Sequence, residues 1–261
     1  PICSLTYNTS FMDDNYNLKN AYNPQTSFNL SFMQSAKQAL SEPLLKEYTE
    51  LNSQQITEGK QSKQQVQQKI RQLALAKILT TSYDHDRELL VEAHIQLAQA
   101  YAANEHHEQA YEHYKEASDK LSLMLGETPR TTNNEIQLML CEHLLSTSFK
   151  LKNYHQTLSY IHEYYSLAQD VETDNARFYV DGVKARVLYA LGDTREAEAL
   201  LADNLSRVEQ GKAVISDSAS FTQKAEIYNY LYKIYKSEKN HMKALEVLAR
   251  SLAHIEQALR N

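Results

Sequence analysis

Apolar positions along most of this chain recur every three or four residues, which is the spacing of an amphipathic helix. From residue 87 onwards the pattern divides into segments of similar length, separated by short polar breaks, and neighbouring segments form pairs. The expected helices span residues 87–104 and 107–124, 134–152 and 154–171, 174–191 and 194–210, and 218–238 and 241–260. The sequence therefore predicts four successive helical hairpins.

Residues typical of helix ends support these boundaries. Asp86, Asp174 and Ser220 each stand just before the first helix of a predicted hairpin, and small polar residues are preferred N-caps. Ser220 and Gln223 also have the spacing of a capping box. A glycine and then a proline, at 126 and 129, follow the first hairpin and suit a helix end.

The N-terminal third has a different pattern. Residues 1–26 are rich in Asn, Tyr, Ser and Thr and poor in aliphatic residues, so we expect a flexible polar arm. Residues 27–86 form a helical segment or an atypical first repeat. Within it we expect one helix that ends near Ser41, a second with Pro43 in its first turn, and a third that ends near Thr81. The hairpins then occupy residues 87–261.

Small and large residues follow a fixed register in the first hairpin. The positions that define this register are Leu97, Ala98, Tyr101, Ala110, Tyr114 and Ala117. The alanines allow two helices to approach closely, and the large side chains fill the space between them. This register resembles the tetratricopeptide repeat. The resemblance covers about residues 87–260 and implies an all-α, right-handed solenoid of antiparallel helix pairs.

The repeats are longer than the plain tetratricopeptide unit. Thr157, Ala197 and Ala244 take the place of Ala110 in the later hairpins, at intervals of 47, 40 and 47 residues, whereas the plain repeat uses 34. Elongated repeats of this kind are similar to those of bacterial regulators and sensors and of motor-adaptor proteins. The resemblance specifies a fold more securely than a function.

Composition excludes several classes of protein. Five glycines and four prolines in 261 residues are too few for the many turns of a sandwich or barrel. The net charge of −6 repels phosphate backbones, so we expect no nucleic-acid binding. Because no apolar run reaches the ~18 residues of a membrane span, we expect a soluble chain without membrane insertion. It could be cytoplasmic, or an extracytoplasmic (periplasmic) domain whose leader has been removed.

The chain offers no recognisable catalytic or cofactor chemistry. His106 and His107, in the densest histidine cluster, are adjacent and face different directions at a hairpin turn, so we expect no metal site. No phosphate-binding glycine loop and no nucleophile with a neighbouring base is present. Cys3 and Cys141 match no metal or redox spacing, and Cys141 lies among leucines, as a buried apolar side chain would. We therefore expect neither an enzyme nor a cofactor.

The resemblance implies a binding surface. In this repeat family the first helix of each hairpin lines a concave groove that holds a partner polypeptide. Its inward positions correspond here to Ile95, Gln99, Glu142, Ser146, Lys150, Arg186, Tyr189, Asn229, Lys233 and Lys236. Four of them are cations, which favours an acidic peptide or a free carboxylate as partner. The alternative is that these are ordinary solvated charges.

Two hypotheses for function follow. The first is a protein-interaction module, the sensory or scaffolding part of a larger regulatory protein or assembly, that binds a partner polypeptide in the groove. The alternative is a regulatory receptor that captures a short signalling peptide or small ligand there.

The last predicted helix carries more apolar residues than one neighbour can cover. Its stripe consists of Leu245, Leu248, Leu252, Ile255 and Leu259. An uncovered apolar face is typical of an interaction surface. We expect it to pack against a second copy of the chain, a following domain or the N-terminal arm. The version that can be tested directly is a homodimer through Leu252, Ile255 and Leu259.

Overall fold

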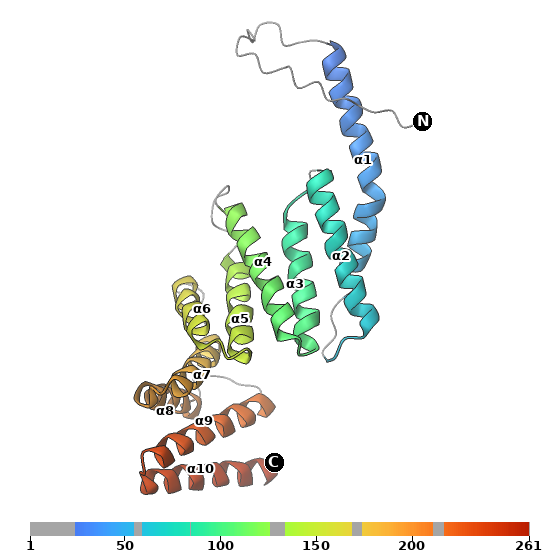
Figure 1. Ribbon diagram of the computed structural model, residues 1–261. Helices are drawn as coiled ribbons and strands as arrows, with labels where there is room; N and C mark the ends of the chain where they lie inside the picture. The colour runs from blue at the N-terminus through green and yellow to red at the C-terminus, as the bar shows by residue number, and fades with distance from the viewer. Residues whose placement is uncertain are drawn as a thin grey trace, which may run out of the picture.

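The computed structural model describes residues 24–54, 59–83, 85–125, 134–168, 174–210 and 217–260. These residues form helices and no strands. The helices are α1 (Pro24–Asn52), α2 (Lys63–Ser82), α3 (Glu88–Ala103), α4 (His107–Leu125), α5 (Asn134–Lys150), α6 (Tyr154–Leu167), α7 (Asp174–Leu191), α8 (Thr194–Glu209), α9 (Asp217–Ser237) and α10 (His241–Arg260). Antiparallel pairs stack into a right-handed solenoid (Figure 1), which confirms the predicted fold class.

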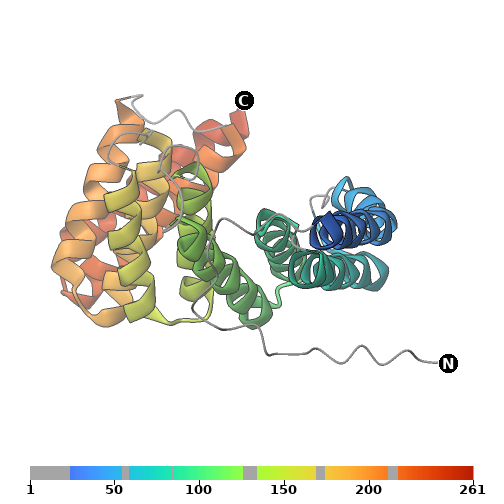
Figure 2. The same ribbon diagram turned by 90° about the horizontal axis from the view of Figure 1, so that it is seen from above.

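The stack curves, so that its two ends differ in orientation. Helices α1 to α4 run side by side, and the last hairpin, α9–α10, lies across the other end (Figure 1). From above, the later hairpins form a broad block, with α1 and α2 at the opposite end of the molecule (Figure 2). The first helices α5, α7 and α9 face the inner side of the bend, and their partners α6, α8 and α10 face outwards.

One turn motif joins the helices of all four predicted hairpins. Its central residue has a positive φ in each case, at Glu105 (63°), Lys152 (60°), Gly192 (92°) and Lys239 (59°). The N–H of the next residue then donates to the carbonyl five residues earlier, as His106 does to Tyr101 at 3.0 Å. This is the hydrogen bond of a Schellman helix end. The four turns are 47, 40 and 47 residues apart, which confirms the elongated repeat.

Close packing of small residues holds each hairpin together, as predicted. Ala98, Ala110 and Ala117 are completely buried where α3 meets α4, and Leu97 and Tyr114 fill the space beside them. Ala197 is equally buried in the third hairpin. Since these positions tolerate no larger side chain without displacement of a helix, they set the distance between the helices.

The N-terminal segment differs from the prediction at Pro43. The expected break between two helices is wrong, because α1 continues through this residue as one helix. Pro43 is exposed, so the helical carbonyl that loses its N–H donor can be hydrated instead. Tyr48 and Leu51, further along α1, pack in one cluster with residues of α2 and α3. The segment thus forms a helix pair that continues the stack.

Helix starts were predicted with mixed success. Asp86 accepts a hydrogen bond from the backbone N–H of Glu88 (3.1 Å), as expected of a residue at the start of α3. Asp174 is the first residue of α7. The predicted cap at Ser220 is wrong, because α9 begins three residues earlier, at Asp217. A capping box exists instead at Ser62 and Gln65, before α2.

A buried cation links the N-terminal pair to the first hairpin. The ammonium group of Lys69, on α2, donates to the carbonyls of Leu51 (2.9 Å) and Gln54 (2.8 Å) and to Oε1 of Gln96 on α3 (2.7 Å). Such a group is tolerated in a core only when it is well hydrogen-bonded. The network therefore specifies how α1, α2 and α3 meet.

Several predictions fall outside the described residues, namely most of the arm at 1–26, the helix-end residues Gly126 and Pro129, and Cys3. The division of the chain into 1–26, 27–86 and 87–261 stays a prediction. No helix within the described part is both long and apolar enough to cross a membrane.

Candidate functional site

A pocket of about 320 Å³ opens between the second, third and fourth hairpins. Its walls come mainly from the first helix of each, with Ser146, Phe149 and Lys150 on α5, four residues of α7, and three of α9. The full lining is Ser146, Phe149, Lys150, Phe178, Tyr179, Gly182, Arg186, Leu201, Asn204, Glu226, Ile227 and Tyr230. Aromatic and aliphatic side chains thus surround a small number of polar groups, which is the usual composition of a ligand site.

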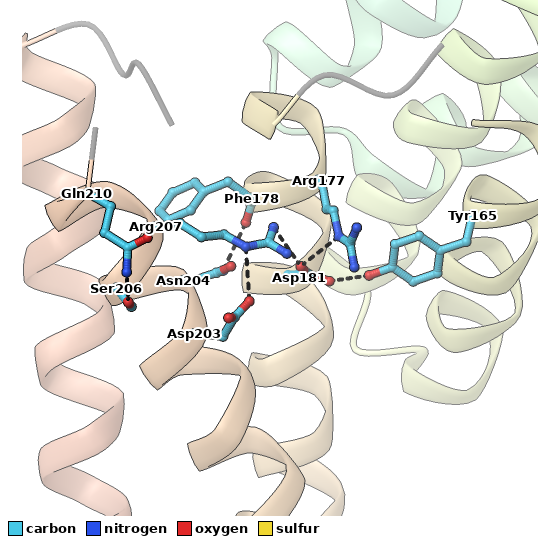
Figure 3. A network of polar contacts seen from close by, with 9 residues as sticks. All are labelled: Tyr165, Arg177, Phe178, Asp181, Asp203, Asn204, Ser206, Arg207 and Gln210. Atoms are coloured by element: carbon cyan, nitrogen blue, oxygen red, sulfur yellow. Dashed lines mark hydrogen bonds and ion pairs between the residues drawn. The ribbon is translucent and has the colours of Figure 1, made fainter. Parts of the chain in front are cut away.

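The floor of the pocket is held by contacts between α7 and α8 (Figure 3). Asn204 is completely buried, and its side-chain N–H donates to the carbonyl of Phe178 at 3.1 Å. Its Oδ1 has no hydrogen-bond partner within the described residues. Gly182 lies opposite, where an added Cβ would be 3.8 Å from Nδ2 of Asn204. Because glycine lacks that atom, the pocket reaches this buried amide.

A polar network beside the floor fixes α7 in position (Figure 3). The Tyr165 hydroxyl, on α6, donates to the carboxylate of Asp181. Arg207, on α8, approaches the same carboxylate at 3.6 Å and also pairs with Asp203 at 3.0 Å. The buried Asp181 therefore bonds to both neighbouring helices, which orients the α7 residues that face the pocket.

Arg186 is the main charged group of the pocket. Its guanidinium lies 4.9 Å from the ring centroid of Phe149 and 3.3 Å from Oε2 of Glu226, so it contacts both neighbouring hairpins. The second cation is Lys150, and Glu226 is the one acidic residue of the lining. Tyr230 completes the wall, and burial raises the pKa of its phenol, which stays neutral. The lining carries a net charge of about +1.

The structure brings some of the predicted groove residues together. Lys150 and Arg186 line the pocket, as does the inward-facing Ser146. Two others contact Tyr230 from outside the pocket, since the ring of Tyr189 meets it edge-on at 5.5 Å and the Lys233 ammonium lies 4.9 Å above it.

The other predicted groove residues lie apart from this site. Lys236 lies 5.8 Å from the ring of Tyr232, and neither Gln99 nor Asn229 is among the lining residues. The sequence interpretation also missed Leu201 and Asn204, because it assigned the groove to first helices only. Gly182 could have pointed to this place, since a glycine inside a helix often marks a close approach.

The histidines form an arrangement that the sequence interpretation did not anticipate. His94 is buried, and its Nδ1 lies 3.1 Å from Nδ1 of His113 across the first hairpin. Burial, with the nearby His113, lowers the pKa of His94 to about 4, so this imidazole is neutral near pH 7. Among the described residues no three His, Cys, Asp or Glu side chains are placed to hold a metal ion.

Cys141 is buried, as predicted, and its thiol donates to the carbonyl of Tyr160 at 3.1 Å. Burial raises the pKa of this thiol to about 12, so it has little thiolate character at neutral pH.

The predicted self-association surface lies on α10, at the end of the stack. Leu252 and Ile255 are exposed in the single chain. The side chain of Leu259 lies outside the described residues. Pairing of two copies through this surface stays a prediction.

Comparison with known proteins places the fold. No family model matches the sequence, and no curated protein matches it. The crystal structure of BtubC (BKLC) from P. vanneervenii is similar with a TM-score of 0.58 and 16% identity, over 76% of this chain and 74% of that chain. A putative kinesin light chain from Podosopora anserina, with nearly identical TPR-like repeats, has a TM-score of 0.55 and 17% identity, over 87% and 98%. At such low identity the likeness is one of fold, and the chain has the fold of TPR-like helical repeats.

Proposed function

We propose that this chain is a protein-interaction module that binds a partner polypeptide on the inner side of the solenoid, in the pocket between α5, α7 and α9. Helical repeat scaffolds of this fold usually mediate protein–protein interaction. The observation that carries the proposal is the composition of the pocket, in which aromatic walls adjoin the two cations Lys150 and Arg186.

The partner chemistry follows from these groups. A volume of about 320 Å³ is at the lower end of the ligand-pocket range of roughly 300–1,000 Å³, so it suits one large apolar side chain rather than a bulky cofactor. Glu226 offsets one of the two cations, and the remaining charge favours an acidic residue next to the apolar one. We propose an extended peptide with an apolar anchor and an adjacent carboxylate.

A regulatory receptor for a short peptide or small ligand is the second candidate. The buried amide of Asn204, with its unpaired Oδ1, favours it, because a ligand N–H could bond to this oxygen. The two candidates differ in the length of ligand that suffices. A receptor binds peptides of under ten residues with saturable affinity, whereas an interaction module needs contacts along several hairpins. In either case we propose that the chain is the sensory or scaffolding part of a larger regulatory protein or assembly.

The experiment is calorimetric titration with synthetic peptides that carry Phe or Leu beside Glu, Gln or Lys. We expect the Glu peptides to bind most tightly and Arg186→Gln to weaken them at least tenfold. Arg195→Gln, on the exposed side of α8, is the matched control because it removes the same charge outside the pocket. The proposal fails if both variants bind equally, or if Lys peptides bind as tightly as Glu peptides.

A further inference from the structure

The repeat register shows what the exposed stripe of α10 corresponds to in the other hairpins. Leu248 is equivalent to Tyr114, Ile161 and Leu201, because all four follow their hairpin turn by nine residues. Those three side chains are buried to within 2% of full burial. Tyr114 and Ile161 lie in a core cluster that includes α5 and α7 residues, and Leu201 lies in one with α9 residues. This position is therefore where one hairpin receives the next.

The rest of the stripe follows the same rule. Ile255 is equivalent to Leu121 and Ala168, which are also buried, and Leu252 is equivalent to the buried Leu205. On α10, however, Leu245 and Leu252 are about 60% exposed, and Leu248 and Ile255 are more than one-third exposed. The end of the described stack thus presents four apolar residues in the register that elsewhere binds a helical hairpin.

The charges beside this stripe indicate the chemistry of its occupant. Lys233 on α9 is equivalent to Arg186 on α7, at the repeat distance of 47 residues. Arg186 pairs with Glu226, which belongs to the helix that the next hairpin supplies. Lys233 and Lys236 are exposed, and within the described part of the chain neither forms an ion pair. A helix docked there as α9 docks on α7 would place a side chain against Lys233.

We propose that this terminal face, made of Lys233, Lys236, Leu245, Leu248, Leu252 and Ile255, docks an acidic amphipathic helix of a partner protein in the manner of a further hairpin. Its apolar stripe covers the leucines, and its carboxylates face the two lysines, repeating the Arg186–Glu226 contact. A symmetric pair of copies fits less well, because it brings two sets of lysines to one interface, where like charges repel. The proposal concerns a surface separate from the pocket and does not depend on it.

The test uses the full chain and two synthetic helical peptides of about 20 residues, each with leucines at positions i, i+3, i+7 and i+10. One peptide has Glu beside the leucines and the other has Lys. Fluorescence anisotropy should show at least tenfold tighter binding of the Glu peptide, with affinity falling as salt increases.

Two variants separate the apolar and the charged contributions. Leu245→Glu with Leu252→Glu should abolish binding of the Glu peptide, and circular dichroism should show an unchanged fold because both residues are exposed. Lys233→Glu with Lys236→Glu should remove the preference for the Glu peptide. Lys46→Glu with Lys115→Glu, at exposed positions elsewhere, should bind as the parent chain does.

Three results would overturn the proposal. One is equal binding of the two peptides, and another is no binding of either. The third is self-association: sedimentation equilibrium at micromolar concentration would show mass above the 30.0 kDa of one chain, and Leu252→Glu with Ile255→Glu would abolish it. In that case the occupant is a second copy.

Discussion

The four hairpin turns provide a matched set of sites at which the repeat geometry can be tested. Three of the residues with positive φ are Glu105, Lys152 and Lys239, and the fourth is Gly192. A left-handed conformation costs a residue with a Cβ about 1–2 kcal/mol, whereas glycine adopts it freely. Glycine loses more backbone entropy on folding, which returns about 0.5–1 kcal/mol of that gain. We therefore expect each of the three glycine substitutions to stabilise the protein by about 0.5–1 kcal/mol.

The reverse substitution should have the opposite sign. Gly192→Ala should destabilise by about 1 kcal/mol, although no atom lies within 4 Å of the added Cβ. The penalty is therefore one of backbone conformation and not of contact. The three glycine effects should add, to about 1.5–3 kcal/mol in the triple variant, because the turns are far apart and share no partners.

Urea unfolding followed by circular dichroism measures these differences, with thermal melts as a second readout. For 150–250 residues, each kcal/mol shifts Tm by about 2–4 °C. Lys115→Gly, at an exposed position inside α4, is the control and should cost about 1 kcal/mol, as glycine does in a helix interior. If Lys152→Gly lowers stability as much as Lys115→Gly does, the left-handed turn is not formed and the repeat register is incorrect.

Two further predictions concern the first hairpin. Ala110→Leu should cost about 1–3 kcal/mol by overpacking, because Ala110 is completely buried between α3 and α4; an unchanged melting temperature would contradict this packing. His94 should make the protein less stable in mild acid. Its pKa is lowered to about 4 by burial and by His113, so between its unfolded pKa of ~6.5 and about 4 the unfolded state binds more protons. Stability is complete above pH ~6.5 and should fall by up to about 3 kcal/mol as the pH approaches 4. Unfolding free energies measured at pH 7.5, 5.5 and 4.5 should show this loss, and His94→Gln should reduce it.

Local signals in the sequence were sufficient to predict the hairpins. Each helix buries one face against its partner, so a period of 3.6 residues marks it wherever it lies in the stack. The small residues Ala110, Thr157, Ala197 and Ala244 mark the register because close helix contacts admit little else. Pro43 misled the interpretation, since a proline inside a helix is tolerated where the freed carbonyl can be hydrated, and exposure is not readable from a local pattern.

The candidate site could be predicted only in part. The repeat register identified Lys150 and Arg186 as inward-facing residues, because inward positions recur with the repeat. Asn204 and Glu226 join them only in the tertiary structure. Contacts between separate hairpins depend on the small rotation from one repeat to the next, which accumulates along the stack. That rotation results from the packing of many side chains together, and it decides that an α8 amide forms the floor of a pocket whose walls belong to α5, α7 and α9.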